Sequence, residues 1–248
     1  MGELQPKAIL NYHWRGILVA LGVMGAWAST LAFALFGPID PTSSWLGVPL
    51  LLLEVHLFAG MFITAHDAMH RLVAPKHKTL NDAIGALCLF CYAFFSYQLL
   101  FDAHHEHHRA PASPADPDFH DGDNPSFWRW FVHFMLHYVS LSQVTAMGSA
   151  FTILTCAFEV PVFRAIGFWV APALLAALNL FYFGTYLPHR LPSHGTYSEP
   201  HRAQSNGFPT WLSYITCYHF GYHWEHHIAP YVPWWRLPTA KRALSQPQ

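Results

Sequence analysis

The sequence predicts an all-α integral membrane protein with four transmembrane helices and one further helical segment that re-enters the membrane or lies along its interface. Composition supports this fold class: hydrophobic residues make up 53% of the 248 residues and charged residues only 11%, whereas soluble domains carry about 25% charged residues. The formal net charge of −1 gives no electrostatic support for a nucleic-acid partner. We expect a single domain over residues 1–248.

Five apolar stretches approach the length of about 20 residues that a helix needs to cross the hydrocarbon core of a bilayer. We expect full crossings at about residues 16–36, 45–65, 130–156 and 165–187, and the remaining stretch is residues 83–101. The first crossing resembles a signal peptide, because Ala32-Phe-Ala34 has the form of a cleavage site. Its apolar core is longer than the roughly 7–15 residues of a secretory signal, so we expect it to be retained.

Residues 83–101 decide the topology. His66 and His70 follow the second crossing, and a second histidine group at residues 104–108 follows this stretch. If the stretch crossed the membrane, the two groups would lie on opposite faces, about 30 Å apart. A segment that enters and returns places them on one face. It must then be helical or covered by protein, because lipid offers no partner to exposed backbone polar groups.

The distribution of basic residues gives an independent orientation. Of the 13 Lys and Arg residues, all but Arg164 lie before the first crossing, in residues 71–129 or after residue 189. Lys and Arg are enriched in cytoplasmic loops, so this side is expected to be cytoplasmic. The same side carries the histidine groups, and we therefore expect a cytoplasmic cap with a His-rich site.

Histidine is more abundant than Lys and Arg together, with 19 residues, and it recurs in fixed spacings. The three groups are His66-Asp-Ala-Met-His70, His104-His-Glu-His107-His108 and His223-Trp-Glu-His226-His227. Residues at i, i+3 and i+4 share one face of a helix, and imidazole is a common ligand of zinc, copper, iron and nickel. One structural zinc ion needs only four ligands, so these eight predict two adjacent metal ions.

The other histidines have a simpler interpretation as interfacial or hydrogen-bonded side chains. His133 and His137 lie within an apolar stretch and are less favoured as ligands. Four acids beside the groups are either acceptors for the second ring N–H of a ligand or solvated surface charges: Asp67, Asp102, Glu106 and Glu225. The sequence contains no His-Glu-x-x-His motif, which counts against a membrane metalloprotease.

One H-x3-H group and two H-x2-H-H groups across a four-span protein resemble the membrane fatty acid desaturase superfamily. Within it, the intervening residues are similar to the bacterial β-carotene ketolases, over roughly residues 45–240. The stretches that carry this similarity are the three His groups, Phe101-Asp-Ala-His, Asp116-Pro-Asp-Phe-His120, Phe183-Gly-Thr-Tyr-Leu-Pro-His-Arg190 and His226-His-Ile-Ala-Pro-Tyr-Val-Pro233.

The resemblance implies a di-iron centre with histidine ligands. The implied ligands are His66, His70, His104, His107, His108, His223, His226 and His227, with His189 as the further histidine that the superfamily supplies after the fourth span. His194 and His201 are the alternatives to His189. Thr185 stands one turn before His189, where some members have an Asn that holds a water on iron. His105 and His219 fall outside the pattern and are expected to support the ligands from outside.

The resemblance also implies an activity. The expected protein is an O2-dependent oxygenase of a bacterial inner membrane that introduces a keto group at C4 and C4′ of the β-ionone rings of β-carotene by successive hydroxylation and dehydration. Two Fe²⁺ ions would be its cofactor, and a ferredoxin-type protein its electron donor, with Arg202, Lys241 and Arg242 as a candidate docking surface. The alternatives are a carotenoid hydroxylase, a fatty acid or lipid desaturase, and, from another class, a His-lined metal transporter.

Two further segments have an expected role. Aromatic residues at 90–97 and 181–183 are candidates to line an apolar channel for a lipid-dissolved polyene, although aromatic packing or an interfacial belt is the favoured interpretation of any individual residue. The Pro- and Asp-rich residues 109–126 predict a loop. We expect it to be a solvated linker unless Asp118 and His120 reach the metal site.

Overall fold

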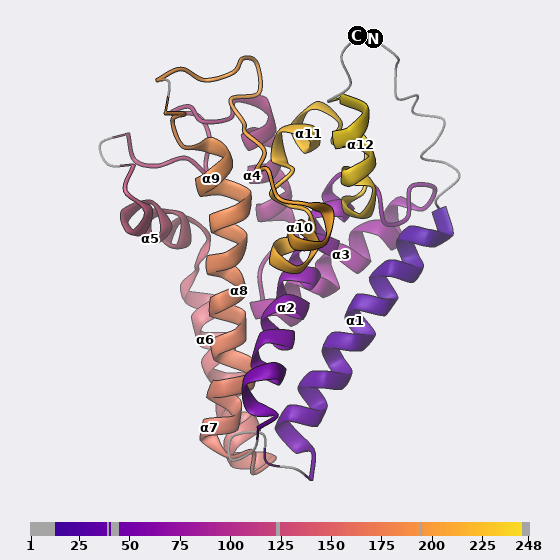
Figure 1. Cartoon of the computed structure of the whole chain (residues 1–248). Coiled ribbons are helices and arrows are strands. Elements are labelled where there is room, and N and C mark those ends of the chain that lie inside the picture. Colours follow the sequence, from indigo (N-terminus) through magenta and orange to yellow (C-terminus); the bar gives the residue numbers. More distant parts are fainter. Residues whose placement is uncertain (1–12, 39, 41–44, 123–124, 194, 245–248) are drawn as a thin grey trace.

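A computed structural model describes residues 13–38, 40, 45–122, 125–193 and 195–244. Every regular element within these residues is helical (Figure 1). The first half contains α1 (His13–Phe36), α2 (Gly47–Met69), α3 (Lys78–Ala93), α4 (Tyr97–Arg109), α5 (Phe127–Tyr138), α6 (Leu141–Thr152) and the π-helical η2 (Ile153–Ala157). The second half contains α7 (Val162–Ala165), η3 (Ile166–Val170), α8 (Ala171–Phe181), η4 (Tyr182–Tyr186), α9 (Leu187–His189), α10 (Thr210–Cys217), α11 (His223–Ile228), η5 (Trp234–Arg236) and α12 (Leu237–Leu244).

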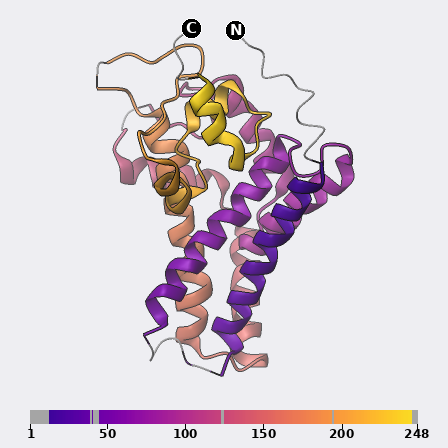
Figure 2. The same ribbon diagram turned by 45° about the vertical axis from the view of Figure 1, so that its right-hand side comes forward.

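Three helices are long and apolar enough to cross a membrane, and up to five crossings result if each of two bent helix pairs counts as one. The three are Trp14–Phe36, Gly47–Met69 and Val162–His189, which agree with three of the predicted crossings. The long helices run lengthwise, with α2 in contact with α1, α3 and α8. Figure 2 shows the short helices α10 to α12 gathered at one end of this bundle. The protein is therefore an all-helical membrane protein with α10 to α12 at one end of its bundle.

The stretch predicted to enter and return is a sharply bent helix pair. Between α3 and α4 the helix axis bends by 105°. Phe94 ends α3 in the left-handed backbone region with a φ of 57°, and Ser96 begins α4 by accepting a hydrogen bond from the Leu99 backbone N–H. The two histidine groups consequently meet, with 2.8 Å between the Nε2 atoms of His70 and His104. The prediction that these groups share one face is confirmed.

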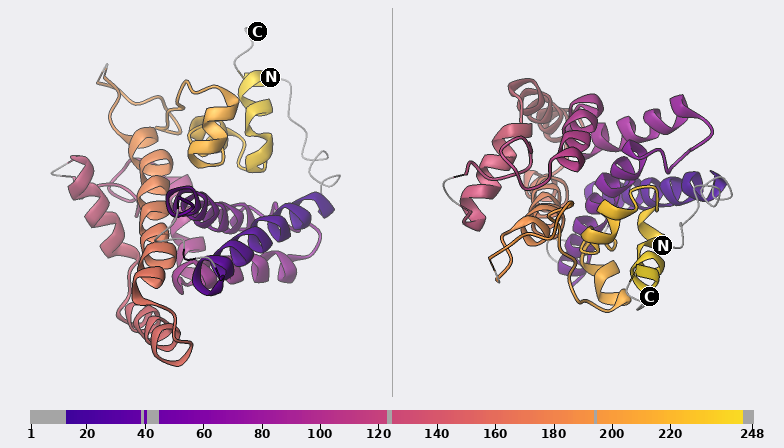
Figure 3. Two further views of the ribbon diagram at one scale, coloured as in Figure 1. Left: turned by 60° about the horizontal axis from the view of Figure 1, so that its bottom comes forward. Right: turned by 90° about the horizontal axis from the view of Figure 1, so that it is seen from above.

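The third predicted crossing differs from the expectation. Instead of one helix over residues 130–156, α5 and the α6–η2 helix are bent by 87° at Val139 and Ser140. Ser140 forms a capping box with Gln143, and the Gln143 side chain also donates to the Ala93 backbone carbonyl. A capping box satisfies the free backbone N–H groups at the start of a helix. Ser140 and Gln143 therefore start a new helix within the apolar stretch, and the preceding helix ends before them. As Figure 3 shows, α5 lies at the edge of the bundle.

The turn from α2 to α3 is fixed by one fully buried amide. The Asn81 side chain donates to the Ala68 carbonyl at 2.7 Å and accepts from the Ala74 N–H at 3.2 Å. Both partners lie close to His70, at the end of α2. Asn81 thus holds the backbone that presents the first histidine group.

We predict that Asn81→Leu lowers the free energy of unfolding by about 1–3 kcal/mol, because two buried backbone groups lose their partner. Thermal unfolding in detergent measures the change. Lys78→Gln is the matched control on the same helix turn: its ion pair with Asp82 is solvent-exposed, so the change should stay within about 1 kcal/mol. Equal stability of the two variants would show that Asn81 does not hold the turn.

Candidate metal centre

Nine histidines from four parts of the chain meet at the end of the bundle that carries the short helices. Their candidate ligand atoms form two groups, and within each group these atoms lie within 4.8 Å of one another. The first group is His66, His70, His104, His108 and His226. The second is His107, His189, His223 and His227. These are the nine residues that the sequence singled out.

Two short helices supply members to both groups. On α4, His104 and His108 face the first group while His107 faces the second. On α11, His226 belongs to the first and His223 and His227 to the second. The two helices oppose each other, with Nε2 atoms 3.0 Å apart for His108–His226 and 3.2 Å apart for His107–His227. Their i, i+3, i+4 spacing therefore creates two adjacent sites.

The protonation state of these side chains suits metal binding. Burial, followed by repulsion from neighbouring histidines, holds the pKa of His223, His226 and His227 well below the ordinary value. Neutral imidazole is the form that donates a lone pair to a metal. Burial acts on His107 in the same direction, but the neighbouring Asp116 raises its pKa. Imidazoles held neutral by burial and by one another, as in α11, are consistent with a cation site.

The geometry also fits. Ligand nitrogens on one ion with metal–nitrogen bonds of about 2.0–2.1 Å lie roughly 3.0–3.4 Å apart, and the Nε2 contacts between the groups' members run from 2.8 to 3.2 Å. His66 and His189 each have a buried Nε2 atom without a hydrogen-bond partner. A buried polar atom without a partner is costly, and a metal ion in each group would satisfy both.

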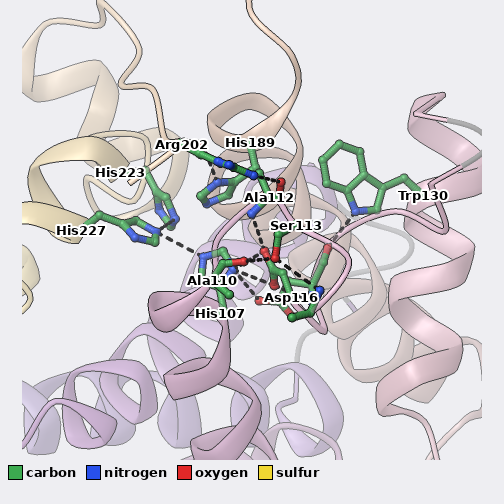
Figure 4. A network of polar contacts seen from close by, with 12 residues as sticks. His107, Ala110, Ala112, Ser113, Asp116, Trp130, His189, Arg202, His223 and His227 are labelled. Atoms are coloured by element: carbon green, nitrogen blue, oxygen red, sulfur yellow. Dashed lines mark hydrogen bonds and ion pairs between the residues drawn. The ribbon is translucent and has the colours of Figure 1, made fainter. Parts of the chain in front are cut away.

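Asp116 fixes the orientation of His107. Both carboxylate oxygens of Asp116 lie 3.0 Å from His107 Nδ1 and accept a hydrogen bond from its N–H, which leaves Nε2 pointing toward the second group (Figure 4). The carboxylate also accepts from the backbone N–H groups of Ala112 and Asp118 at 2.8 and 2.9 Å. Burial alone would raise the pKa of Asp116, but His107 and these donors hold it below its usual value.

His189 is oriented in the same manner by the backbone. Its Nδ1 atom donates to the Arg202 carbonyl at 3.1 Å, and the Arg202 guanidinium donates to the Ala112 carbonyl at 3.3 Å. The π-helical turn η4 precedes His189 and places Thr185 on the wall of the adjoining cavity. Contacts through Arg202 thus join the His189 segment to the loop that carries Asp116.

The four acids named from the sequence do not behave alike. Asp67 is buried, with an oxygen 3.9 Å from His66 Nδ1, and Glu225 is buried and accepts from the Ser205 hydroxyl. Asp102 and Glu106 lie on the exposed face of α4. Asp116, the residue that binds a candidate ligand, was missed as a partner, although it opens the Asp116-Pro-Asp-Phe-His120 stretch.

The part of the loop that the structure describes up to residue 122 is not a solvated linker. Asp116 is 6% exposed, and the Asp118 carboxylate approaches His107 Nδ1 to 3.8 Å. His120 does not reach the groups and instead packs on Trp130. The expectation of a linker was wrong, because hydrogen bonds to Asp116 fold the loop onto the site.

Other histidines remain outside both groups. His105 Nδ1 contacts the Phe101 carbonyl of its own helix, and the His219 ring packs against Tyr222 and Trp234. His133 and His137 are exposed. The His201 ring lies 6.2 Å from that of His227, outside the ligand groups, and His194 lies outside the described residues.

The three basic residues named as a docking surface are not all exposed. Arg202 is half-buried and paired with Glu199, and Lys241 lies over the Tyr222 ring and donates to the Asn206 carbonyl. Arg242 is exposed. Arg202 and Lys241 hold the fold around α9 to α12 together, so the expected surface is reduced.

An apolar cavity adjoins the histidines. It measures about 800 Å³ with its open mouth included, and His66, His104, His107 and His223 form part of its wall. The remaining wall is largely aromatic and aliphatic, and includes Tyr92, Phe95, Phe134, Tyr138 and Phe181. Of the aromatic stretches named from the sequence, Tyr92, Phe95 and Phe181 line the cavity, whereas Phe90 is exposed. The site thus combines a His-rich centre with an adjoining apolar compartment.

The amino-acid sequence of the chain is similar to the sequences of known proteins. The fatty acid desaturase family matches residues 43–157 and 143–247. The chain is 38% identical to a β-carotene 4-ketolase of Protosiphon botryoides, over 92% of the chain and 63% of that relative, and so spans less than two thirds of its length. It is 37% identical to a β-carotene ketolase of Haematococcus lacustris, over 92% and 79%, and 36% identical to a β-carotene ketolase of a Paracoccus strain, over 95% of both chains.

We predict that His70→Ala, His107→Ala and His226→Ala each reduce bound metal and abolish turnover while leaving membrane insertion intact, because each removes a ligand atom from a buried group. Metal analysis of the purified protein and product analysis provide the measurement. His77→Ala, at the start of α3 and outside both groups, is the control and should retain activity. Turnover in one of the three variants would remove that residue from the ligand set.

For Asp116 we expect a partial loss of metal affinity when its charge is removed. Asp116→Asn removes the negative charge that holds the His107 tautomer, and metal affinity should fall about 10- to 100-fold. Metal titration in the presence of a competing chelator measures the loss. Asp102→Asn, on the exposed face of α4 and paired with Gln98, is the matched control. An affinity unchanged in Asp116→Asn would show that His107 does not depend on it.

Proposed function

The chain belongs to the fatty acid desaturase family and, within it, to the group of β-carotene ketolases, and we propose that it is a membrane di-iron oxygenase that introduces a keto group at C4 and C4′ of the β-ionone rings of β-carotene. The observation that carries this proposal is the placement of two histidine groups in and beside the wall of an apolar cavity.

Each histidine group would hold one iron ion. His66, His70, His104, His108 and His226 would bind one, and His107, His189, His223 and His227 the other. A reduced iron pair supplies the activation of O2 that oxidation of an unreactive C–H bond requires. The residues around it keep the ligands neutral and oriented, as Asp116 does for His107.

The cavity would select and position the substrate. A carotenoid dissolves in the bilayer, and a wall of aromatic and aliphatic side chains lets its polyene leave lipid at little free-energy cost. The histidines in the wall would lie beside the ring, so that C4 is the carbon presented for oxidation. The same apolar wall excludes water, which protects a reactive site from side reactions.

The overall conversion takes two oxidations at one carbon. The first inserts oxygen into a C4–H bond to give the 4-hydroxy ring, and the second gives a geminal diol. Each consumes one O2, two electrons and two protons and releases one water. The diol then loses water to leave the ketone. The electrons must come from another protein, for which we propose a ferredoxin-type donor.

We further propose that the chain works as one domain, in a bacterial inner membrane, with the histidine groups on the cytoplasmic side. The concentration of Lys and Arg on that side supports this orientation. It gives a soluble electron donor access to the end of the bundle where α10 to α12 lie.

The rival functions differ in what they require. A metal transporter would need histidines distributed along its spans, whereas the nine lie together at one end of the bundle. A carotenoid hydroxylase or a lipid desaturase would use the same metal centre, so only the product separates them from a ketolase.

We predict that bacteria accumulating β-carotene convert it to 4-keto and 4,4′-diketo products when they express this chain. The added carbonyls extend the conjugation, so the cells redden, and chromatography with mass spectrometry identifies the ketones. Cells expressing His226→Ala should keep unconverted β-carotene. Products hydroxylated only at C3 would assign the chain to the hydroxylases instead.

A further inference from the structure

Helix α5 separates the cavity from the surroundings of the bundle. Phe134, Met135 and Tyr138 line the cavity from one side of α5. On its other side Trp128 and Leu136 are 64% and 74% exposed. The exposed side of α5 also carries Val132 and the polar Arg129, His133 and His137, so its outer surface combines large apolar side chains with basic ones.

The attachment of α5 is confined to a few contacts. Its aromatic side chains gather around one buried residue, Phe181, whose ring centroid lies 5.2 Å from that of Phe134 and 5.3 Å from that of Phe131. Trp130, the one buried residue of α5, donates through Nε1 to the Asp118 carbonyl at 2.8 Å. The Tyr138 hydroxyl donates to the Asp118 carboxylate. Both side-chain hydrogen bonds therefore end on one residue of the 109–126 loop.

The backbone at one end of α5 allows it to swing. Val139 and Ser140 are extended, with ψ angles of 123° and 155°, and the 87° bend to α6 lies there. Ser140 caps α6 independently of α5, through its contacts with Gln143. A change in direction at these two residues would move α5 and leave α6 in place, because hinges are a few residues at element ends.

Asp118 connects α5 to the metal centre. Its carboxylate lies 3.8 Å from His107 Nδ1, and its backbone N–H donates to the Asp116 carboxylate that orients His107. The residue to which α5 is hydrogen-bonded is thus also in contact with a proposed iron ligand. When α5 moves, the Tyr138 hydroxyl leaves this carboxylate and the surroundings of His107 change.

We propose that α5 is a lateral gate through which a carotenoid passes between the bilayer and the cavity, and that Asp118 is a positioning residue that links closure of this gate to the orientation of His107. The proposal rests on the proposed ketolase function for the identity of the substrate. A substrate dissolved in lipid has to pass between helices, and α5 is the cavity wall that exposes large apolar side chains, Trp128 and Leu136, on its outer side and has a hinge at one end.

Cross-linking tests the gate directly. Phe127, at the N-terminal end of α5, and Tyr182, in η4, have ring centroids 5.9 Å apart, and neither residue lines the cavity. A Phe127→Cys/Tyr182→Cys variant, joined by a short thiol-specific reagent that a reductant cleaves, holds α5 closed. Uptake of β-carotene from liposomes, measured without O2 and electron donor as pigment that co-purifies with the protein, should fall about tenfold or more and recover on reduction.

Two controls separate gating from damage. Phe36→Cys/Phe158→Cys, with ring centroids 6.4 Å apart at the opposite end of the bundle, should take up β-carotene normally when cross-linked. Protein loaded with β-carotene before cross-linking should still oxidise the pigment that it holds. Normal uptake by the locked Phe127–Tyr182 variant would overturn the gate, whatever the reaction proves to be, since uptake needs no turnover.

The role of Asp118 is tested through Tyr138 and Trp130. Tyr138→Phe removes the hydrogen bond to the Asp118 carboxylate, whereas Trp130→Phe removes only the hydrogen bond to the Asp118 carbonyl. Both loosen α5, but only Tyr138→Phe should alter the spectrum of the iron centre and lower kcat about tenfold at unchanged iron content. An identical spectrum in Tyr138→Phe and the wild type would overturn the link to His107.

Discussion

The structure depends on the meeting of nine imidazoles, six of them buried, at one end of a membrane bundle. Imidazole nitrogens buried without partners are costly, and the Nε2 atoms of His66 and His189 form no hydrogen bond with the residues that the structure describes. A cation in each group would remove this cost at both sites. Much of the rest of the fold can be understood as the means of bringing α2, α4, α9 and α11 to one place and holding them there.

The bent pair α3–α4 meets this requirement within a membrane. A straight helix after α2 would carry its histidines to the far face, whereas the left-handed Phe94 and the Ser96 cap return the chain to the face it left. Asn81 then fixes the turn beneath His70. Local backbone chemistry, rather than the metal ligands themselves, determines that the two groups meet.

The sequence was sufficient for features that have a fixed spacing. The spacing of the histidines identified eight of the nine members of the two groups, and the ninth, His189, was implied by the resemblance to the desaturase superfamily. The requirement that the groups share a face predicted the return of residues 83–101. The partner of His107 could not be predicted in this way, since Asp116 lies nine positions away in an irregular loop whose path no periodicity describes. The break at Ser140 was encoded in the spacing of Ser140 and Gln143, but a continuous apolar stretch concealed it.

Helices α4 and α11 each supply ligands to both histidine groups, so neither group is complete unless both helices are in place. An ion bound in one group would hold both helices in place, and with them the ligands that they supply to the other group. The second ion should therefore bind more tightly than the first, and a population short of iron should consist of empty and fully loaded molecules with few that hold a single ion. The iron supply would then determine how many molecules hold both ions, and not how active each fully loaded molecule is.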